Sequence, residues 1–219
     1  MSAPSVETEV AVVAKGVTLP GTLTAPPECR GVVIFAHGSG SSRLSRRNVA
    51  VARSLNERGC GTLLFDLLTP AEASDRQNVF AIDLLAGRVA AATHWLAGRP
   101  EGAVGPVGYF GASTGAAAAL VAAAGLGDAV AAVVSRGGRP DLAGEALSRV
   151  VAPTLLLVGS LDTQVLELNR RAERALRCEK RLTVIEGASH LFEEPGTLDE
   201  AARLAGEWFV ERFRGEIST

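Results

Sequence analysis

The chain consists of short apolar runs that alternate with segments of helical periodicity. Two strand-like runs near the amino terminus, 6–14 and 17–25, flank Gly16 and predict a hairpin. Compact apolar runs predict buried strands further along the chain. These runs cover residues 31–36, 61–68, 107–110, 129–135, 153–159 and 181–185.

Most segments between these runs have the spacing of helices. Longer helices are expected at 44–58, 79–96, 116–124, 165–177 and 198–213, with a short one at 140–149 and a polar segment at 69–78. This alternation implies a mostly parallel central sheet with helices on both faces, so the expected fold class is α/β. No repeat, linker or change of composition marks a boundary, and a single domain over residues 1–219 is therefore expected.

Composition and charge narrow the choice of partners. The formal net charge of -2 gives no reason to expect nucleic acid or an anionic membrane. The three cysteines, Cys29, Cys60 and Cys178, show neither a C-x-x-C pair nor metal-ligand spacing, so free thiols in a reducing cytosol are expected. Residues 1–10 are polar and acidic and lack the regions of a signal peptide, which predicts a cytoplasmic protein.

One stretch, 107–134, is rich in Ala, Val and Gly and is long enough to span a bilayer. Ser113, Asp128 and several glycines interrupt it, and alanine is only weakly lipophilic. A strand, a helix and a second strand explain the stretch better than a transmembrane helix. We therefore expect no membrane span.

Residues 111–115 have the sequence Gly-Ala-Ser-Thr-Gly, a G-x-S-x-G pattern between a predicted strand and a predicted helix. A serine on the sharp turn between such elements exposes its hydroxyl at the carboxyl edge of a sheet. The pattern also arises by chance in chains rich in Gly, Ser and Ala. Its strand-to-helix context favours Ser113 as a catalytic nucleophile.

A serine nucleophile needs a base within hydrogen-bond reach. The chain has three histidines, and His94 falls inside a predicted helix. His37 and His190 both follow predicted strands and so belong to the same sheet edge as Ser113. Only His190 follows an acid that follows Ser113, which is the order expected for this architecture, so His190 is the predicted base. The alternative is a loop or capping histidine.

The base in turn needs a carboxylate that orients it. Asp162 follows the strand at 153–159 and is the predicted partner of His190. Asp141, one strand earlier, is the second candidate, and Glu186 is a weaker third. Asp162 has an alternative role as the cap of the helix that starts near residue 165.

Negative charge that develops on an attacked carbonyl needs preorganised donors. The Thr114 N–H, at the start of the helix after the nucleophile, is one predicted oxyanion donor. The second is the Ser39 N–H in the sequence His-Gly-Ser-Gly at 37–40, whose glycines allow close approach of the substrate. His37 is interpreted as a structural residue that shapes this loop.

Taken together, residues 37–40, residues 111–115, Asp162 and His190 resemble the α/β-hydrolase superfamily, and within it the small serine hydrolases related to dienelactone hydrolase. The closer likeness is to bacterial hydrolases that also occur fused to phosphoribosyltransferase domains. It is carried by residues 35–43, 108–115, 135–140 and 189–193 and spans about 31–209. The resemblance implies an α/β-hydrolase fold and a triad of Ser113, Asp162 and His190. Dienelactone hydrolase itself has Cys at the nucleophile position, so its lactone substrate does not transfer.

The interval between the strands at 129–135 and 153–159 is short, where many relatives insert a large lid. A minimal lid predicts an open site for small or exposed acyl groups. Arg136 and Arg139 follow the first of these strands, and we hypothesise that one of them binds an anionic substrate group. A structural salt bridge is the alternative.

The resulting expectation is a serine hydrolase of carboxylic esters, with lactones and thioesters as further substrates. The alternatives are a peptidase or amidase with the same triad and a non-catalytic binding protein. No metal or organic cofactor is implied. The expected partner is a small-molecule substrate, without nucleic acid or membrane, for a monomer or homodimer.

Overall fold

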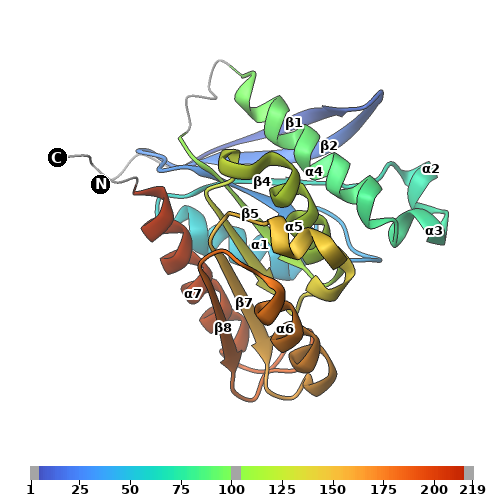
Figure 1. Ribbon diagram of the computed structural model, residues 1–219. Coiled ribbons are helices and arrows are strands. Elements are labelled where there is room, and N and C mark those ends of the chain that lie inside the picture. The colour runs from blue at the N-terminus through green and yellow to red at the C-terminus, as the bar shows by residue number, and fades with distance from the viewer. Residues whose placement is uncertain (1–4, 100–104, 215–219) are drawn as a thin grey trace.

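The computed structural model describes residues 5–99 and 105–214 (Figure 1). Its core is an eight-stranded sheet with the order β1-β2-β4-β3-β5-β6-β7-β8. The strands are β1 (Val6–Ala14), β2 (Val17–Ala25), β3 (Val32–Ala36), β4 (Gly61–Phe65), β5 (Val107–Ala112), β6 (Ala132–Arg136), β7 (Thr154–Gly159) and β8 (Lys180–Ile185). Strand β2 pairs antiparallel with both of its neighbours, β1 and β4. The pairs from β4 to β8 in this order are parallel.

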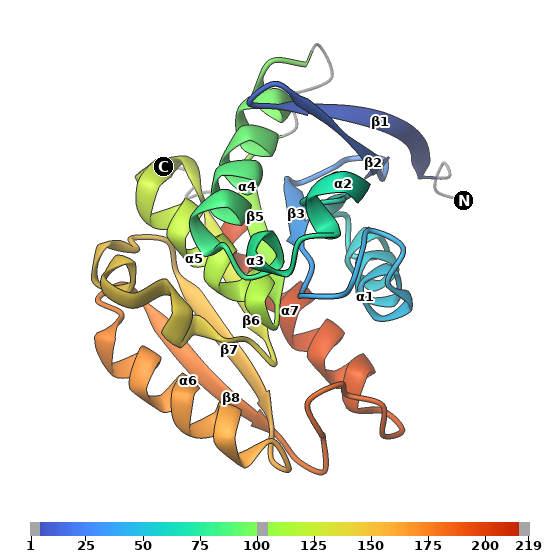
Figure 2. The same cartoon turned by 90° about the vertical axis from the view of Figure 1, so that its right-hand side faces the viewer.

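Helices cover both faces of the sheet (Figures 1 and 2). They are α1 (Arg46–Asn56), α2 (Pro70–Ala73), α3 (Arg76–Val79), α4 (Ile82–Ala97), α5 (Thr114–Leu126), α6 (Thr163–Ala175) and α7 (Thr197–Phe213), with 3-10 helices η2 (Gly127–Ala129) and η3 (Pro140–Arg149). Helices α1 and α7 pack together on one face. Helices α4, α5 and α6, with η3, cover the other.

Every residue of β3 is buried, because its side chains point alternately into two apolar layers. Val33 and Phe35 belong to the layer that contains Phe209 of α7. Ile34 and Ala36 belong to the layer beneath α4 and α5. A strand covered on both faces has no polar positions, which explains the continuous apolar runs in the sequence.

Helix α5 is apolar all round and is built mainly from Ala and Gly. The side chains of Ala116, Ala117, Ala118 and Ala119 are fully buried. Such small side chains let the helix axis approach the sheet closely, immediately after β5. The position of Ser113 between β5 and α5 is therefore set by tight packing of both elements.

The structure confirms the α/β class and the alternation of elements. The predicted hairpin agrees in its bounds with β1 and β2, while other boundaries shift by a few residues. The polar segment 69–78 contains two four-residue helices, α2 and α3, that periodicity did not predict. Of the segment 1–10, residues 1–4 lie outside the described residues. No helix within 5–99 and 105–214 is long and apolar enough to cross a membrane.

Gly115 gives a direct test of this close packing. An added Cβ would lie 2.1 Å from the backbone oxygen of Ala36, and neither backbone can move without disturbing the sheet. We expect Gly115→Ala to lower the free energy of unfolding by at least about 2 kcal/mol. Urea denaturation provides the measurement.

Gly125 is the matched control in the same helix, because an added Cβ meets nothing within 4 Å. Gly125→Ala should stabilise the protein by about 0.5–1 kcal/mol, since alanine loses less backbone entropy on folding. Equal effects of the two substitutions would contradict the assigned packing of α5.

Candidate active site

Ser113 has a left-handed backbone, with φ 51° and ψ -123°, which is rare for a residue with a Cβ. Its N–H donates to the carbonyl oxygen of Arg136 at 3.4 Å. Its own carbonyl oxygen accepts from the N–H groups of Ala116, at 3.1 Å, and Arg139, at 3.0 Å. These bonds hold a conformation whose strain is about 1–3 kcal/mol.

Glycines make room for this turn. An added Cβ on Gly111 would lie 2.4 Å from the Cα of Ala116, and one on Gly38 would lie 3.0 Å from the Cβ of Ser113. Three chain segments therefore meet at the turn at distances that only glycine permits. Ser113 lies between them at the carboxyl edge of the central strand β5.

His190 and Asp162 are in direct contact. The Nδ1 atom of His190 lies 2.6 Å from Oδ2 of Asp162, and the two side chains are 40% and 13% exposed. With Nδ1–H as donor to the carboxylate, Nε2 remains free to accept a proton. Asp162 is the residue before α6, but its side chain makes no capping bond. Its carboxylate therefore orients His190 and does not cap the helix.

Ser113 and His190 line the same cavity, whose volume is about 190 Å³. Ser39 and Arg136 also line it. The structure thus brings six of the seven predicted site residues to one edge of the sheet, since Thr114 follows Ser113 and Asp162 is bonded to His190. Asn48 of α1 lines the cavity too, and no sequence motif pointed to it.

The two other candidate acids have different partners. Asp141 accepts two hydrogen bonds, each 2.8 Å long, from the guanidinium of Arg139. Glu186 accepts from the hydroxyl of Ser160 at 3.3 Å. Among the three acids considered, Asp162 is the one bonded to His190.

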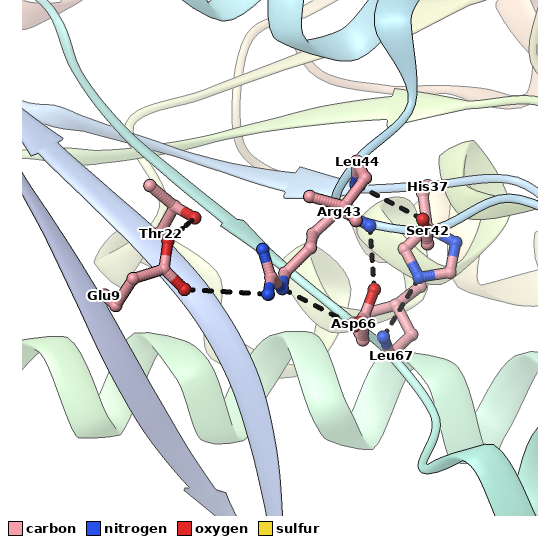
Figure 3. A network of polar contacts seen from close by, with 8 residues as sticks. All are labelled: Glu9, Thr22, His37, Ser42, Arg43, Leu44, Asp66 and Leu67. Carbon is pink, nitrogen blue, oxygen red and sulfur yellow. Dashed lines mark hydrogen bonds and ion pairs between the residues drawn. The ribbon is translucent and has the colours of Figure 1, made fainter.

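His37 holds the loop after β3 in place (Figure 3). Its Nε2 accepts from the N–H of Leu67 at 3.0 Å, and Nδ1–H donates to the carbonyl oxygen of Gly38 at 3.1 Å. Burial lowers the pKa of His37, against the opposing effects of the Gly38 carbonyl and Asp66. A neutral imidazole with both nitrogens engaged is a structural residue, as the sequence suggested.

Arg43 fastens the other end of this loop (Figure 3). Its N–H donates to Oδ1 of Asp66 at 2.8 Å, and its guanidinium lies 3.7 Å from Oδ2 of the same residue. The guanidinium also pairs with Glu9 of β1 at 3.6 Å, and Glu9 accepts from Thr22 of β2 at 2.7 Å. The loop that carries Ser39 is thereby tied to β4 and to the amino-terminal hairpin.

The two predicted oxyanion donors are adjacent. The N–H of Ser39 donates to the hydroxyl oxygen Oγ1 of Thr114 at 2.9 Å. Thr114 opens α5, and the first N–H groups of a helix have no partner within it. The oxyanion role of Ser39 stays a prediction, and it requires the Thr114 hydroxyl to share or release this N–H.

Arg136 and Arg139 differ in their surroundings. Arg139 is paired with Asp141, which is the salt bridge considered as its alternative role. Arg136 is 6% exposed and has no carboxylate partner among the described residues. Its Nη2 lies 3.5 Å from Oδ1 of Asn48, and its guanidinium lies 5.5 Å from the ring centre of Phe192. Burial, and then the charge of Arg47, lower its pKa to about 10, so it remains cationic at neutral pH.

The remaining candidate chemistries are metal binding and cysteine reactivity. Within the described residues, no group of three or more His, Cys, Asp or Glu is arranged to hold a metal ion. The three cysteines are free thiols. Burial raises the pKa of Cys60 to about 11, so it is not a reactive thiolate.

This combination of a helix-covered parallel sheet and a strained serine after a central strand is that of an α/β-hydrolase. The sequence model of the dienelactone hydrolase family matches residues 19–214. The chain belongs to the dienelactone hydrolase family and is a hydrolase.

Curated relatives extend beyond this chain. Proteins from two strains of Mycobacterium tuberculosis, named as phosphoribosyl transferases, are 59% identical over 212 residues. The match covers 97% of this chain and 48% of each relative, so the chain spans about half their length. Their name agrees with the fusion type that the sequence resembles.

Solved structures agree with the fold. Dienelactone hydrolase from Anabaena variabilis has a TM-score of 0.92 and 52% identity, over 94% of this chain and 98% of that one. Est1E from Butyrivibrio proteoclasticus has a TM-score of 0.79 and 18% identity, over 94% and 99%. The second likeness concerns the fold alone.

The buried His37 should make stability depend on pH. Its pKa in the folded protein lies below the ordinary 6.5, so the unfolded chain takes up the proton first as the pH falls. The contribution of neutral His37 to the free energy of unfolding is therefore complete above pH 6.5. It is lost as the pH drops below that value. We expect the free energy of unfolding, measured in urea from about pH 7.5 to about pH 5, to fall less steeply in His37→Gln.

Glutamine keeps an uncharged acceptor for the Leu67 N–H, so the variant retains the contact while removing the titration. Other titrating groups are common to both proteins and cancel in the comparison. Identical slopes would show that His37 does not remain neutral in the folded state.

Proposed function

We propose that the protein is a serine hydrolase of carboxylic esters, with a catalytic triad of Ser113, His190 and Asp162. The observation that carries the proposal is the cavity shared by Ser113 and His190, because the strained serine and a histidine oriented by a carboxylate meet there. Family membership supports the hydrolytic class. Small esters are the favoured substrates, and lactones and thioesters are further members of the same reactive class.

In the proposed mechanism, Oγ of Ser113 attacks the acyl carbon while Nε2 of His190 takes the hydroxyl proton. Asp162 stabilises the imidazolium through the Nδ1–H bond. His190 then returns the proton to the leaving alcohol, and an acyl-enzyme remains. A water molecule, deprotonated by His190, attacks this ester, and the carboxylic acid leaves as Ser113 regains its proton.

The oxyanion formed at each stage is assigned to the N–H groups of Thr114 and Ser39. A full negative charge is a stronger acceptor than a hydroxyl oxygen, so it competes well with Thr114 Oγ1 for the Ser39 N–H. The loop needs no large movement for this exchange, because His37 and Arg43 already anchor it.

Two other functions use the same geometry. An amidase would apply the triad to a poorer leaving group, and a binding protein would leave it unused. Turnover of 4-nitrophenyl acetate beside aminoacyl anilides separates the first from an esterase. Covalent labelling of Ser113 by a fluorophosphonate probe, mapped by mass spectrometry, separates the second.

The triad assignment is tested by substitution at its nucleophile and its acid. We expect Ser113→Ala and Asp162→Asn each to lower kcat for 4-nitrophenyl acetate by about a thousandfold or more, because both act on the same proton transfer. Steady-state kinetics give the values.

Asp141→Asn is the matched control, since Asp141 is a nearby acid bonded to Arg139 and not to His190. It should leave kcat within about threefold of the unaltered protein. A loss below about tenfold in Ser113→Ala, or a larger loss in Asp141→Asn than in Asp162→Asn, would refute the assignment.

We further propose that Arg136 binds an anionic group on the alcohol half of the substrate. A buried cation without a carboxylate partner is costly unless an anion completes it. Arg136 ends β6, which lies between β5 and the strands that carry Asp162 and His190. The leaving oxygen must face His190 to receive its proton, so the alcohol half lies on the side of Arg136.

The charge preference is tested with two aryl acetates whose leaving phenols differ in charge, the anionic 4-acetoxybenzoate and its neutral methyl ester, each followed by release of acetate. We expect Arg136→Gln to reduce the ratio of kcat/KM for the anionic over the neutral ester by about tenfold to a hundredfold. Arg139→Gln should change this ratio little, because the charge of Arg139 is already paired with that of Asp141. An equal change for both esters in Arg136→Gln would instead indicate a structural role through Phe192.

A further inference from the structure

A second cavity lies on the opposite side of Ser113 from His190. Its volume is about 270 Å³, and it is walled by apolar side chains from the end of β4, from α2 and α3, and from α4. These include Leu67, Leu68, Pro70, Val79 and Leu85. Gly38, Ser39 and Ser41 line both this cavity and the one that contains Ser113. The two cavities therefore adjoin each other at the loop after β3 that carries Ser39.

The two titratable side chains of this second cavity, His37 and Asp66, already have partners. His37 bonds to the Leu67 N–H and the Gly38 carbonyl, and Asp66 accepts from Arg43 (Figure 3). Burial keeps His37 neutral by lowering its pKa. An apolar occupant consequently leaves His37 and Asp66 with their partners, whereas a charged occupant finds no free counter-ion in either side chain.

The wall formed by α2 is held firmly. The hydroxyl of Thr69 accepts from the Glu72 N–H at 3.2 Å, and the Glu72 carboxylate accepts from the Thr69 N–H at 2.9 Å. The carboxylate also pairs with the buried Arg88 of α4 at 2.6 Å. The Thr69 N–H, and secondarily Arg88, lower the pKa of Glu72 and keep it charged. The cavity is thus preformed by a capped helix and an ion pair.

Strand order decides which half of a substrate enters this cavity. From one side to the other, the sheet edge carries Leu67 after β4, Ser39 after β3, Ser113 after β5, and His190 after β8. The leaving alcohol must face His190, so the acyl chain extends in the other direction, over the oxyanion loop towards β4. We infer that the cavity over the end of β4 is an acyl pocket, which binds an apolar acyl group about the size of a phenyl ring with a short linker. The inference rests on the proposed serine esterase function.

The size follows from comparison with known apolar cavities. An engineered cavity of about 150 Å³ binds benzene. The cavity over β4, at about 270 Å³, therefore has room for a ring and a few further carbon atoms, or for a six-carbon chain. Long fatty acyl chains exceed it.

The experiment uses 4-nitrophenyl esters, which share one leaving group, with acetyl, butyryl, hexanoyl, phenylacetyl and decanoyl groups. Each methylene buried from water favours binding by about fourfold, so we expect kcat/KM to rise at least about tenfold from acetate to hexanoate or phenylacetate. It should fall again for decanoate. A flat series would overturn the acyl pocket.

Ala73 and Ala71 provide matched variants in α2. Ala73 lines the cavity and Ala71 does not, and both are exposed, so phenylalanine at either position is compatible with folding. We expect Ala73→Phe to reduce the ratio of kcat/KM for hexanoate over acetate by about tenfold, and Ala71→Phe to keep the ratio of the unaltered protein. Val79→Ala enlarges the cavity and should move the optimum to a longer acyl group. Equal ratios in the two phenylalanine variants would overturn the proposal.

Two further outcomes separate this inference from the function on which it rests. If hydrolysis of all these esters persists in Ser113→Ala, the proposed function fails, whatever the acyl series shows. If Ser113 is required but the gain appears with larger apolar alcohols on a constant acetyl group, the function stands and the acyl pocket is refuted.

Discussion

The backbone of Ser113 is the constraint on which the rest of the site depends. A residue with a Cβ at φ 51° is stable only where its surroundings leave no alternative. Here the N–H and carbonyl groups of Ser113 are bonded to the segment 136–139 after β6, and Gly38 and Gly111 allow the neighbouring chain to close in. The same packing requires α5 to be built from small residues. Composition, helix packing and nucleophile geometry are thus consequences of one tight turn.

Parallel strand order divides the surroundings of this turn into two chemically different sides. Towards β4 the walls are mainly apolar, and the polar side chains of His37 and Asp66 there are bonded to other parts of the protein. Towards β8 lie the Asp162–His190 pair and the cation of Arg136. An acyl group held at Ser113 therefore has apolar surroundings on the side of β4 and polar surroundings on the side of β8. Selectivity of this kind needs no large lid, and the interval between β6 and β7 contains only η3.

Sequence patterns predicted the sheet, the main helices and the Asp162–His190 contact, because each depends on periodicity or on chain order. Helices α2 and α3 were missed since four residues are too few to show a period, although Thr69 and Glu72 form a capping box that signals a helix start. The sequence also left open which of the two arginines forms a salt bridge and which is available to an anionic substrate group. Arg139 forms a salt bridge with Asp141, which is only two residues away in the chain. Arg136 instead contacts Asn48 and Phe192, which come near it only in the folded protein.

Two kinds of energetically costly feature, positive φ at residues with a Cβ and a buried cation, occur together near the cavity that Ser113 and His190 line. Within residues 5–99 and 105–214, four residues other than glycine have positive φ: Lys15, Glu28, Ser113 and Phe192. The first two are exposed, and Lys15 belongs to the tight turn of the hairpin, where such backbone is common. Ser113 lines the cavity, and Phe192 lies two residues after His190, with its ring centre 5.5 Å from the guanidinium of Arg136, which has no carboxylate partner among the described residues. A contact of this kind returns only about 0.5–2 kcal/mol, less than the desolvation of a charge. Stability alone does not account for these costly features, so their position beside Ser113 and His190 argues for a functional constraint.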